Sequence, residues 1–406
     1  MARSIVVIGS GPAAVGAAMA AKKQDAEAQV ILITDETCEP YEKPPLSKAV
    51  LLGKAAPEDA PIAGKDGLAA HGVEMRFNTR CTGIDRQART VETNQGPISY
   101  DALVLAPGSL MRELPLLPAG MPRVHYLRTE ADARALKATM ADCKSIVVIG
   151  GGLIGLEVAA SAAEMGAQVV VLEAAPRIMG RACDDQTSAA ILDEHLHRGV
   201  EVHTGVQVTR VSLQIDGDLA LETDTGDMHV AGCVVVGVGV KPDETLAAAA
   251  GLTVNDGIVV DAQCRTDDPA IFAAGDATRF PGPDGTLVRL ENWRHAQEHG
   301  AVAGRNAAGA SDEYRTVPSY WSEQYDLYIQ GVGWPQADVT RVERPQQGKG
   351  RLVLETRDGV LVYAVGINAQ RDLAAVRRMI ERKTPVDPVA LADPAVSFQT
   401  MLKAKA

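Results

Sequence analysis

Two segments of the chain repeat the same order of an apolar run, a glycine turn and a helix of small residues. The first is SIVVIGSGPAAVGAAMAA at residues 4–21, and the second begins with SIVVIGGGLIGLE at residues 145–157. A further apolar run follows each of them, at residues 29–34 and 168–172. Strands that alternate with helices at this spacing predict an α/β fold with mainly parallel sheets. The repeat therefore predicts two units of one kind in the same chain.

Length, charge and cysteine content narrow the class of protein. A chain of 406 residues is expected to form two to three domains. The formal net charge of −12 argues against a general nucleic-acid-binding protein and against docking on an anionic membrane. No apolar run approaches the roughly 18–20 residues that a membrane span needs. The six cysteines form no CxxC pair, so neither a metal site nor a disulfide framework is indicated, and we expect a reduced cytoplasmic protein with no secretion signal.

The order of the remaining segments predicts three domains. A buried strand, YDALVLAPGS at residues 100–109, precedes a proline-rich linker, and a similar strand and turn lie at residues 231–243. From about residue 317 the pattern changes to that of a small α+β domain. The expected domains are a discontinuous first one at 1–110 and 240–316, a second at 111–239 and a third at 317–406.

The first glycine turn has the spacing of a dinucleotide-binding loop. In GSGPAA, Gly9 and Gly11 match the first two glycines of GxGxxG, and Ala14 takes the third position. The first allows a tight turn, the second lets the backbone approach a pyrophosphate, and the third must be small for helix–strand packing. Asp35 ends the next strand, at the distance where an acid bonds ribose hydroxyls. The alternative is a glycine turn without a ligand, which the combination of strand, helix and acid disfavours.

The second glycine turn matches the pattern in full, with Gly150, Gly152 and Gly155 in register. Glu173 closes the following strand, where a carboxylate accepts hydrogen bonds from a ribose and repels a 2′-phosphate. This predicts NADH rather than NADPH, although Arg177 lies close enough in sequence to meet a phosphate. Two dinucleotide sites in one chain predict hydride transfer from a nicotinamide to a flavin, with FAD at the first loop and NADH at the second.

The chain resembles the FAD-dependent, NADH-dependent ferredoxin reductases that supply bacterial Rieske oxygenases and P450s in the catabolism of aromatic compounds. The resemblance runs essentially from end to end. The motifs that carry it are PYEKPPLSK (40–48), VHYLRTEADA (124–133), GGGLIGLE (150–157), VVVGVGVKPD (234–243), IFAAGDAT (271–278), VRLENWRHAQEHG (288–300) and PSYWSEQYDL (318–327). It implies two Rossmann-like domains arranged as in glutathione reductase, a C-terminal α+β domain, and a small [2Fe–2S] ferredoxin as the partner of a monomer or homodimer.

The resemblance also implies which residues bind the cofactors. Asp276 is expected to bond the ribityl chain of FAD, and Glu157 is expected to pair with Lys48 beside the flavin and the nicotinamide. A charged pair in a water-excluded cleft is costly to build, so it favours a functional role over bulk stability; the alternative is a surface ion pair. The other expected cofactor contacts are Pro12, Ala13, Lys43, Cys81, Arg128, Trp293, Trp321, Leu153, Ile154 and Gly239.

Three positions depart from the family pattern, which usually has Arg, Thr and Trp where this chain has Lys43, Pro107 and Ser319. Pro107 has no N–H to donate, and Lys43 keeps a charge but lacks the planar guanidinium. Ser319 leaves less aromatic surface near the flavin. These changes put flavin affinity and partner contacts in doubt without disabling hydride transfer.

Two other functions compete with the ferredoxin reductase. A thiol-dependent NADH oxidase or disulfide reductase would use Cys38, but no second cysteine is near it in the sequence. A redox signalling flavoprotein resembling apoptosis-inducing factor would also carry a PPLSK-like segment. His295 and His299 share one face of a predicted helix, and without further ligands they do not indicate a metal site. A basic tail helix is expected to dock an acidic ferredoxin; it carries Arg371, Arg377, Arg378, Arg382 and Lys383.

Overall fold

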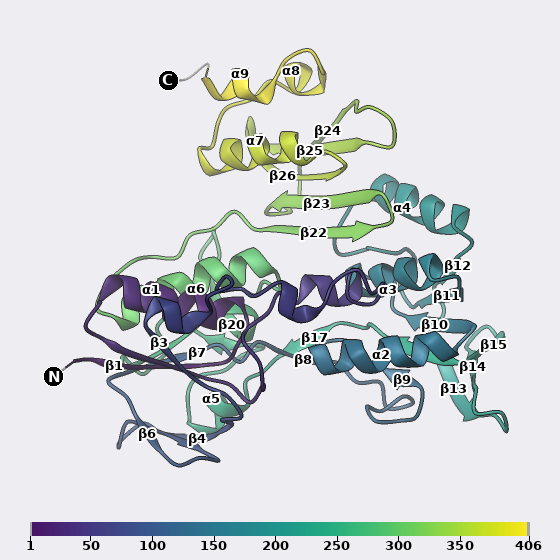
Figure 1. The fold of residues 1–406 in the computed structure, drawn as a ribbon. Helices are drawn as coiled ribbons and strands as arrows, with labels where there is room; N and C mark the ends of the chain where they lie inside the picture. The colour runs from purple at the N-terminus through teal and green to yellow at the C-terminus, as the bar shows by residue number, and fades with distance from the viewer. Residues whose placement is uncertain (1, 404–406) are drawn as a thin grey trace. The chain divides into compact units, whose positions relative to one another are not determined.

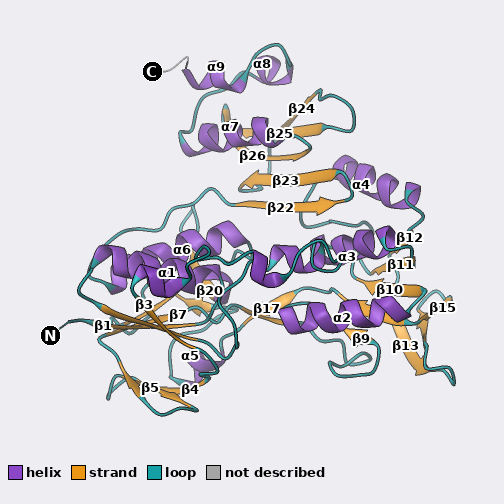
Figure 2. Ribbon diagram, in the orientation of Figure 1, coloured by secondary structure: helices purple, strands orange, loops and turns teal. Residues whose placement is uncertain are grey.

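The computed structural model describes residues 2–403. They form two compact units, which are described separately. Of the described residues, the first unit comprises 2–42, 56–111 and 240–316, and the second comprises 43–55, 112–239 and 317–403. Figures 1 and 2 show the elements and their labels.

A parallel sheet of five strands, in the order β19-β7-β1-β2-β3, is the centre of the first unit. Four of its strands, β1, β2, β7 and β19, are short apolar runs that are largely buried, as in Ser4–Ile8, which is typical of a parallel sheet covered on both faces. The edge strand β3 is more polar and more exposed. The elements are β1 (Ser4–Ile8), α1 (Pro12–Gln24), β2 (Gln29–Ile33), η2 (Pro57–Asp59), η3 (Leu68–His71), β3 (Val73–Arg76), β4 (Cys81–Asp85), β5 (Thr90–Thr93), β6 (Ile98–Ser99), β7 (Ala102–Leu105), β8 (Ser109–Met111), β17 (Val240–Pro242), α5 (Thr245–Ala249), β18 (Ile258–Val259), β19 (Ile271–Ala273), η4 (Gly275–Ala277), β20 (Thr278–Pro281), β21 (Leu287–Val288) and α6 (Trp293–Ala307).

Helices α1 and α6 of this unit lie side by side (Figure 1) because glycine lets their backbones approach closely. A Cβ atom added at Gly300 would lie 2.0 Å from the carbonyl oxygen of Ala13, and one at Gly304 would lie 2.0 Å from that of Ala17. From the other helix, a Cβ atom at Gly16 would lie 2.7 Å from the carbonyl oxygen of Gln297. The start of α1, which carries the first glycine loop, is therefore fixed against α6 by backbone contact.

A second parallel sheet, in the order β12-β11-β10-β16-β9, belongs to the second unit. A three-stranded antiparallel sheet, β13-β14-β15, accompanies it. The elements of this part are η1 (Pro44–Ser47), β9 (Val124–His125), α2 (Glu130–Asp142), β10 (Ser145–Ile149), α3 (Leu153–Glu164), β11 (Gln168–Glu173), α4 (Asp185–His197), β12 (Glu201–Thr204), β13 (Val208–Leu213), β14 (Leu219–Thr223), β15 (Met228–Ala231) and β16 (Cys233–Val236).

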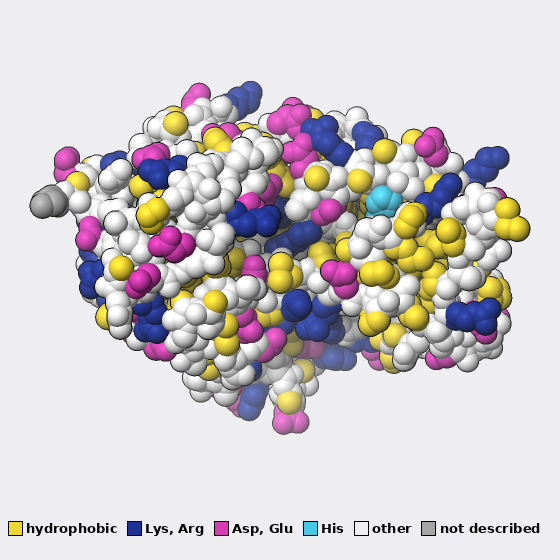
Figure 3. All heavy atoms as spheres, turned by 90° about the horizontal axis from the view of Figure 1, so that it is seen from below, with side chains coloured by type: hydrophobic (Ala, Val, Ile, Leu, Met, Phe, Trp, Pro, Cys, Tyr) yellow, Lys and Arg dark blue, Asp and Glu magenta, His cyan; other side chains and the backbone are white. Residues whose placement is uncertain are grey.

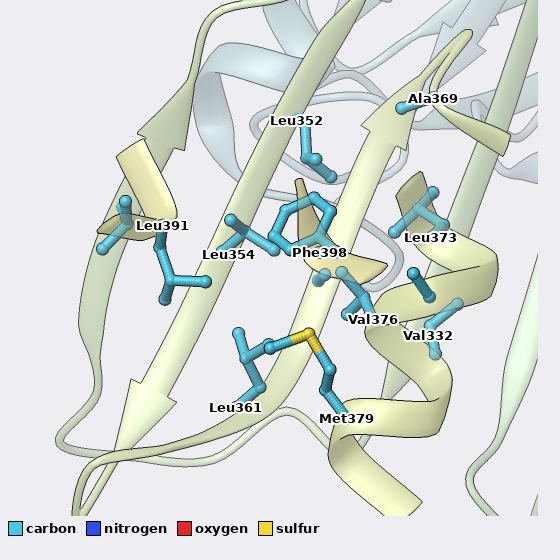
Figure 4. Close-up of a cluster of buried hydrophobic side chains, with 13 residues drawn as sticks. Val332, Leu352, Leu354, Leu361, Ala369, Leu373, Val376, Met379, Leu391 and Phe398 are labelled. Atoms are coloured by element: carbon cyan, nitrogen blue, oxygen red, sulfur yellow. The ribbon is translucent and has the colours of Figure 1, made fainter. Parts of the chain in front are cut away.

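The C-terminal part of the second unit is an antiparallel sheet of five strands, β22-β23-β26-β25-β24, covered by helices. Its elements are β22 (Ser319–Gln324), β23 (Leu327–Gly333), β24 (Thr340–Arg344), β25 (Arg351–Arg357), β26 (Val360–Ile367), α7 (Gln370–Glu381), α8 (Pro388–Ala392) and α9 (Phe398–Lys403). Leu373, Val376 and Met379 of α7 point into the core that Figure 4 shows. The buried guanidinium of Arg344 lies 4.4 Å from the ring centre of Phe398 and donates to the carbonyl of Leu391, which ties α8 and α9 to the sheet.

The predicted α/β fold class, with two Rossmann-like sheets and a C-terminal α+β part, is confirmed. The three domain boundaries stay a prediction. Within the described residues, no helix has both the length and the apolar character that crossing a bilayer requires. On the face that Figure 3 shows, basic side chains lie among acidic and apolar ones.

Candidate active site

The first glycine loop, between β1 and α1, contains two glycines with different surroundings. At Gly9 only glycine fits the backbone, whereas the space beside Gly11 is open. Gly9 has φ +120°, and a Cβ atom there would lie 2.2 Å from the carbonyl oxygen of Ala106. A Cβ atom at Gly11 would meet nothing within 4 Å, so packing does not explain this glycine. Helix α1 begins at Pro12 without a side-chain cap, and Ala14 is fully buried against the sheet. An uncapped helix start next to open space fits a pyrophosphate group.

The second glycine loop, between β10 and α3, repeats this geometry. Gly150 has φ +108°, and a Cβ atom there would lie 2.5 Å from the carbonyl oxygen of Gly237. At Gly155 a Cβ atom would lie 2.0 Å from the carbonyl oxygen of Gly150, whereas at Gly152 it would meet nothing within 4 Å. Helix α3 also starts without a side-chain cap, at Leu153 and the largely exposed Ile154. Both loops thus have the backbone that a dinucleotide needs.

The acids that follow the two loops behave differently. Both oxygens of Glu173 accept backbone hydrogen bonds, from the N–H of Gly151 and of Ala175, each at 2.6 Å. Asp35, by contrast, is half exposed, and its carboxylate lies 3.3 Å from the guanidinium of Arg80.

Glu36, which we did not single out in the sequence, is the acid that contacts the first loop. It accepts a hydrogen bond of 3.0 Å from the hydroxyl of Ser10. Its position directly after Asp35 was the available signal, since either acid at the strand end can turn toward the loop. Asp35 as the ribose ligand therefore stays a prediction, with Glu36 as its neighbour on the loop.

Arg177, the residue that argued for a phosphate, is engaged elsewhere. Its guanidinium lies 2.9 Å from the carboxylate of Asp185 and donates to the carbonyl of Gly180. These contacts occupy Nε and Nη2, whereas the buried Nη1 has no hydrogen-bond partner among the described residues, so the position of Arg177 does not decide between the two nicotinamides.

Lys48 and Glu157 form a buried ion pair within the second unit. The Lys48 Nζ lies 3.0 Å from the Glu157 Oε2, and the two side chains are 16% and 3% exposed. The same oxygen accepts a hydrogen bond from the Ser47 hydroxyl, and Oε1 accepts one of 2.7 Å from the Ser322 hydroxyl. Ser161, one turn further along α3, donates to the carbonyl of Ser47 at 2.8 Å. Sequence reasoning missed these three serines because they lie far apart in the chain and only the fold gathers them.

The turn after β19 presents Asp276. Gly275 has φ +79°, and a Cβ atom there would lie 2.8 Å from that of Ala13, so the turn requires glycine. The Gly275 N–H donates to Nδ1 of His299 at 3.2 Å, and the Ser109 hydroxyl donates to Asp276 at 3.3 Å. Burial lowers the pKa of His299 well below its usual value, so the ring is a neutral acceptor that fixes the turn.

Comparison with known proteins identifies the family. Residues 3–300 match the model of the pyridine nucleotide-disulphide oxidoreductases, and residues 319–402 match that of the reductase C-terminal domain. The ferredoxin–NAD(+) reductase component of the anthranilate 1,2-dioxygenase system of Burkholderia cepacia is 40% identical over 402 residues, which are 98% of each chain. The chain belongs to the pyridine nucleotide-disulphide oxidoreductase family.

Solved structures place this oxidoreductase among the ferredoxin reductases. The ferredoxin reductase for the CYP199A2 system from Rhodopseudomonas palustris has a TM-score of 0.93 and 32% identity, with both chains fully covered. The covalent putidaredoxin reductase–putidaredoxin complex gives a TM-score of 0.93 and 31% identity, over 99% of this chain and 98% of that one. The predicted ferredoxin reductase family and the predicted enzyme class are therefore confirmed.

The remaining predicted cofactor residues of the oxidoreductase are divided between its two units. In the first unit, Trp293 begins α6. Cys81 begins β4, and burial raises the pKa of its thiol to about 11, so the thiol is neutral at physiological pH; its contact with a cofactor stays a prediction.

In the second unit, Lys43 precedes η1 and Trp321 lies in β22 opposite Gln330. Arg128 donates its backbone N–H to Asp132 just before α2. Gly239 has φ +98°, and its carbonyl accepts from the N–H of Arg112. Their contacts with a cofactor stay predictions.

Proposed function

We propose that the oxidoreductase transfers electrons from NADH through FAD to a small [2Fe–2S] ferredoxin of an oxygenase system. The observation that carries the proposal is the presence of two open glycine loops in a chain that matches ferredoxin reductases along its whole length. The cofactors FAD and NADH follow from family membership, and a ferredoxin is the partner in the relatives. The [2Fe–2S] type of the ferredoxin, a monomeric or homodimeric state and a cytoplasmic location are part of the proposal.

Neither loop supplies redox chemistry of its own. FAD, when bound, accepts a hydride from NADH and releases electrons singly. The protein holds and orients the two cofactors and excludes water from them. The amides at the start of α1 and α3 bind pyrophosphates, with Gly11 and Gly152 leaving room for them. Asp276, fixed by His299 through Gly275, offers a carboxylate to the hydroxyls of the ribityl chain.

The Lys48–Glu157 pair is proposed to orient the reacting rings. Glu157 is 3% exposed and accepts donors on both oxygens, so its charge is fully compensated and its orientation is fixed. Lys48 is the more exposed partner of the pair, and its ammonium group has further N–H donors besides the one that bonds Glu157. A buried pair of this kind is expensive to assemble and therefore favours function over stability.

The thiol alternative has no support beyond Cys38. Burial raises the pKa of the Cys183 and Cys233 thiols to about 12, which keeps these two cysteines protonated and unreactive. Cys38 is half-buried in the loop after β2. A ferredoxin reductase needs no thiolate, so Cys38 separates the two functions experimentally.

The proposal is tested by mixing the FAD-loaded protein with NADH under anaerobic conditions and following the flavin absorbance. Rapid bleaching by NADH, followed by reoxidation on addition of a [2Fe–2S] ferredoxin, is expected. Flavin that is reduced by NADH but reoxidised only by a disulfide or by oxygen would contradict the ferredoxin assignment. Equal rates with NADPH would contradict the assignment of the nicotinamide.

A further inference from the structure

A line of buried side chains connects Glu157 to the far end of the β22–β23 hairpin, all of it within the second unit. The Ser322 hydroxyl lies 2.7 Å from Glu157 Oε1, and Gln324 Nε2 lies 3.0 Å from the Ser322 oxygen. Nε2 of His195 lies 2.9 Å from Gln324 Oε1, and the Tyr325 hydroxyl lies 3.3 Å from His195 Nδ1. Ser322, Gln324 and His195 are each at most 1% exposed.

The carboxylate at one end fixes the direction of every hydrogen bond in this line. An ionised Glu157 can only accept, so Ser322 must donate to it. The Ser322 oxygen then accepts from the amide nitrogen of Gln324, which turns the amide oxygen of Gln324 toward His195. His195 must therefore carry its proton on Nε2, and its Nδ1 is left to accept from Tyr325.

The protonation states at the outer end agree with this direction. Burial lowers the pKa of His195, so the imidazole is neutral and has one donor and one acceptor nitrogen. Burial raises the pKa of Tyr325 well above its usual range, so the hydroxyl remains a donor. The Tyr325 ring lies against the His195 ring at 5.1 Å and beneath the guanidinium of Arg198 at 4.9 Å.

Charged groups surround the outer end without entering the line. Arg198 lies 2.9 Å from Glu194 and 3.2 Å from Asp326. Lys349 lies 2.7 Å from Glu194 and 3.2 Å from Asp326. These pairs fix α4 and the hairpin turn, and so hold His195 and Tyr325 at the distance that the hydrogen bonds need.

We propose that Ser322, Gln324 and His195 are positioning residues, which act through Glu157 to hold its carboxylate in one orientation toward Lys48. The inference rests on the proposed role of the Lys48–Glu157 pair in flavin reduction. Oε1 receives the Ser322 hydroxyl at 2.7 Å and, at the longer distance of 3.4 Å, the backbone N–H of Glu323, while Oε2 receives Lys48 and Ser47. Ser322 is thus the shorter of the two donors that orient Oε1, so a loss anywhere along the line loosens the pair. The stabilising free energy of such a line exceeds the sum of its separate hydrogen bonds, because each bond polarises the next.

The hydrogen-bond direction is tested by ¹⁵N NMR of the FAD-loaded, histidine-labelled protein, with the His195 signals assigned from the His195→Gln variant. We expect the neutral Nε2–H tautomer of His195 alone in the wild type. In Ser322→Ala the amide of Gln324 is free to turn over, and a mixture of the two His195 tautomers is expected. The Nδ1–H tautomer in the wild type, or an unchanged spectrum in Ser322→Ala, would overturn the proposal.

The consequence for the reaction is tested by the rate of anaerobic flavin reduction at saturating NADH. Ser322→Ala is expected to lower it about tenfold and His195→Leu about threefold, with the KM for NADH unchanged. His195→Gln restores a donor for Gln324 and is expected to recover a rate within about twofold of the wild type. Equal losses in the Leu and Gln variants would indicate packing alone, and should His195→Leu not fold, Gln324→Leu replaces it.

The two proposals fail in different ways. An unchanged reduction rate in Lys48→Ala would refute the role of the pair in the reaction, whatever the tautomer of His195. A slow Lys48→Ala combined with normal rates in both Ser322→Ala and His195→Leu would leave the pair in place and refute the positioning residues.

Discussion

The two glycine loops have the same backbone but differ in what the following helix does. Counted from the helix start, the fifth residue is Gly16 in α1 and Glu157 in α3. Gly16 lets α1 pack backbone to backbone against α6, where a Cβ atom would lie 2.7 Å from a carbonyl oxygen. Glu157 instead brings a buried carboxylate to Lys48. One repeat thus uses this position for packing and the other for a charge, although both keep the same phosphate-binding turn.

The acids after the two loops also differ in how they contact the loop. Glu173 accepts two backbone N–H groups and so fixes the second loop directly. The first loop is held through a side chain, by the bond from Ser10 to Glu36. The second loop therefore depends on the Glu173 carboxylate for its shape, and the same carboxylate is the one predicted to bind the ribose.

The largest effect is expected from removing either partner of the ion pair that Glu157 of α3 forms with Lys48. Lys48→Ala or Glu157→Ala should slow flavin reduction by NADH about a hundredfold or more, because the remaining partner is left uncompensated and no longer holds the reacting groups in position. Anaerobic stopped-flow absorbance measures this. Lys54→Ala is the matched control, since Lys54 pairs with Glu164 at 3.4 Å with both side chains more exposed, and it should change the rate little. An equal loss of flavin reduction rate in Lys54→Ala and in the buried-pair variants would contradict a specific role for the Lys48–Glu157 pair.

The shared backbone of the loops is tested by adding one methyl group to the open glycine of each. Gly11→Ala should lower the affinity for FAD, and Gly152→Ala should raise the KM for NADH, each by about tenfold or more, because the methyl group blocks hydrogen bonds to a charged phosphate. Without cofactors, both variants should melt near the temperature of the cofactor-free wild type, since the added Cβ atom meets nothing within 4 Å. Loss of folding in either variant, or full retention of FAD by Gly11→Ala, would contradict the assignment.

The second loop's acid should decide the choice of nicotinamide. In the wild type kcat/KM should favour NADH by about tenfold or more, since a charge clash with a 2′-phosphate supplies at least 1.4 kcal/mol. Glu173→Ala should reduce that ratio and should also lower the absolute rate with NADH, because Gly151 and Ala175 lose their acceptor. Steady-state kinetics with both nicotinamides measures this. A wild type that uses NADPH equally well would overturn the role of Glu173.

Ferredoxin docking should give a smaller effect that depends on salt. The predicted basic helix is α7, but its Arg377 is only 13% exposed and pairs with Glu381 at 3.0 Å, so charge reversal there would disturb packing. Arg378 and Arg382 are exposed and are the better test. Arg378→Glu with Arg382→Glu should raise the KM for ferredoxin about threefold at low salt, without changing NADH-dependent ferricyanide reduction. Arg210→Glu, on an exposed strand, is the control, and an unchanged KM for ferredoxin would remove α7 from the interface.

The smallest effect is expected at Cys38. A flavin that transfers electrons without a thiol partner makes Cys38→Ser nearly silent, with NADH-dependent ferredoxin reduction within about twofold of the wild type. The measurement is steady-state turnover together with the flavin content of the purified protein. Loss of turnover with flavin still bound would favour the thiol-dependent oxidase or disulfide reductase.

The sequence predicted the parts of the site that are local. Each glycine turn depends on the residues on either side of it, so spacing alone identifies Gly9, Gly11, Gly150 and Gly152 as loop positions. The resemblance to ferredoxin reductases supplied Lys48, Glu157 and Asp276, which no local pattern marks. It could not supply Glu36 in contact with Ser10, because the choice between two adjacent acids depends on how the strand end twists.

By itself, the sequence determined two parallel-sheet units, a distinct C-terminal part and the family, because apolar runs, glycine spacing and long motifs are properties of neighbouring residues. Only the tertiary structure decided which polar groups share the interior. Ser47 and Ser322 come from distant segments and donate to Glu157 only once η1, α3 and the β22–β23 hairpin have packed together. His195 of α4 is connected to Glu157 only indirectly, through Gln324 and Ser322. A buried carboxylate must find its donors wherever the fold brings them, and these partners follow no spacing that the sequence reveals.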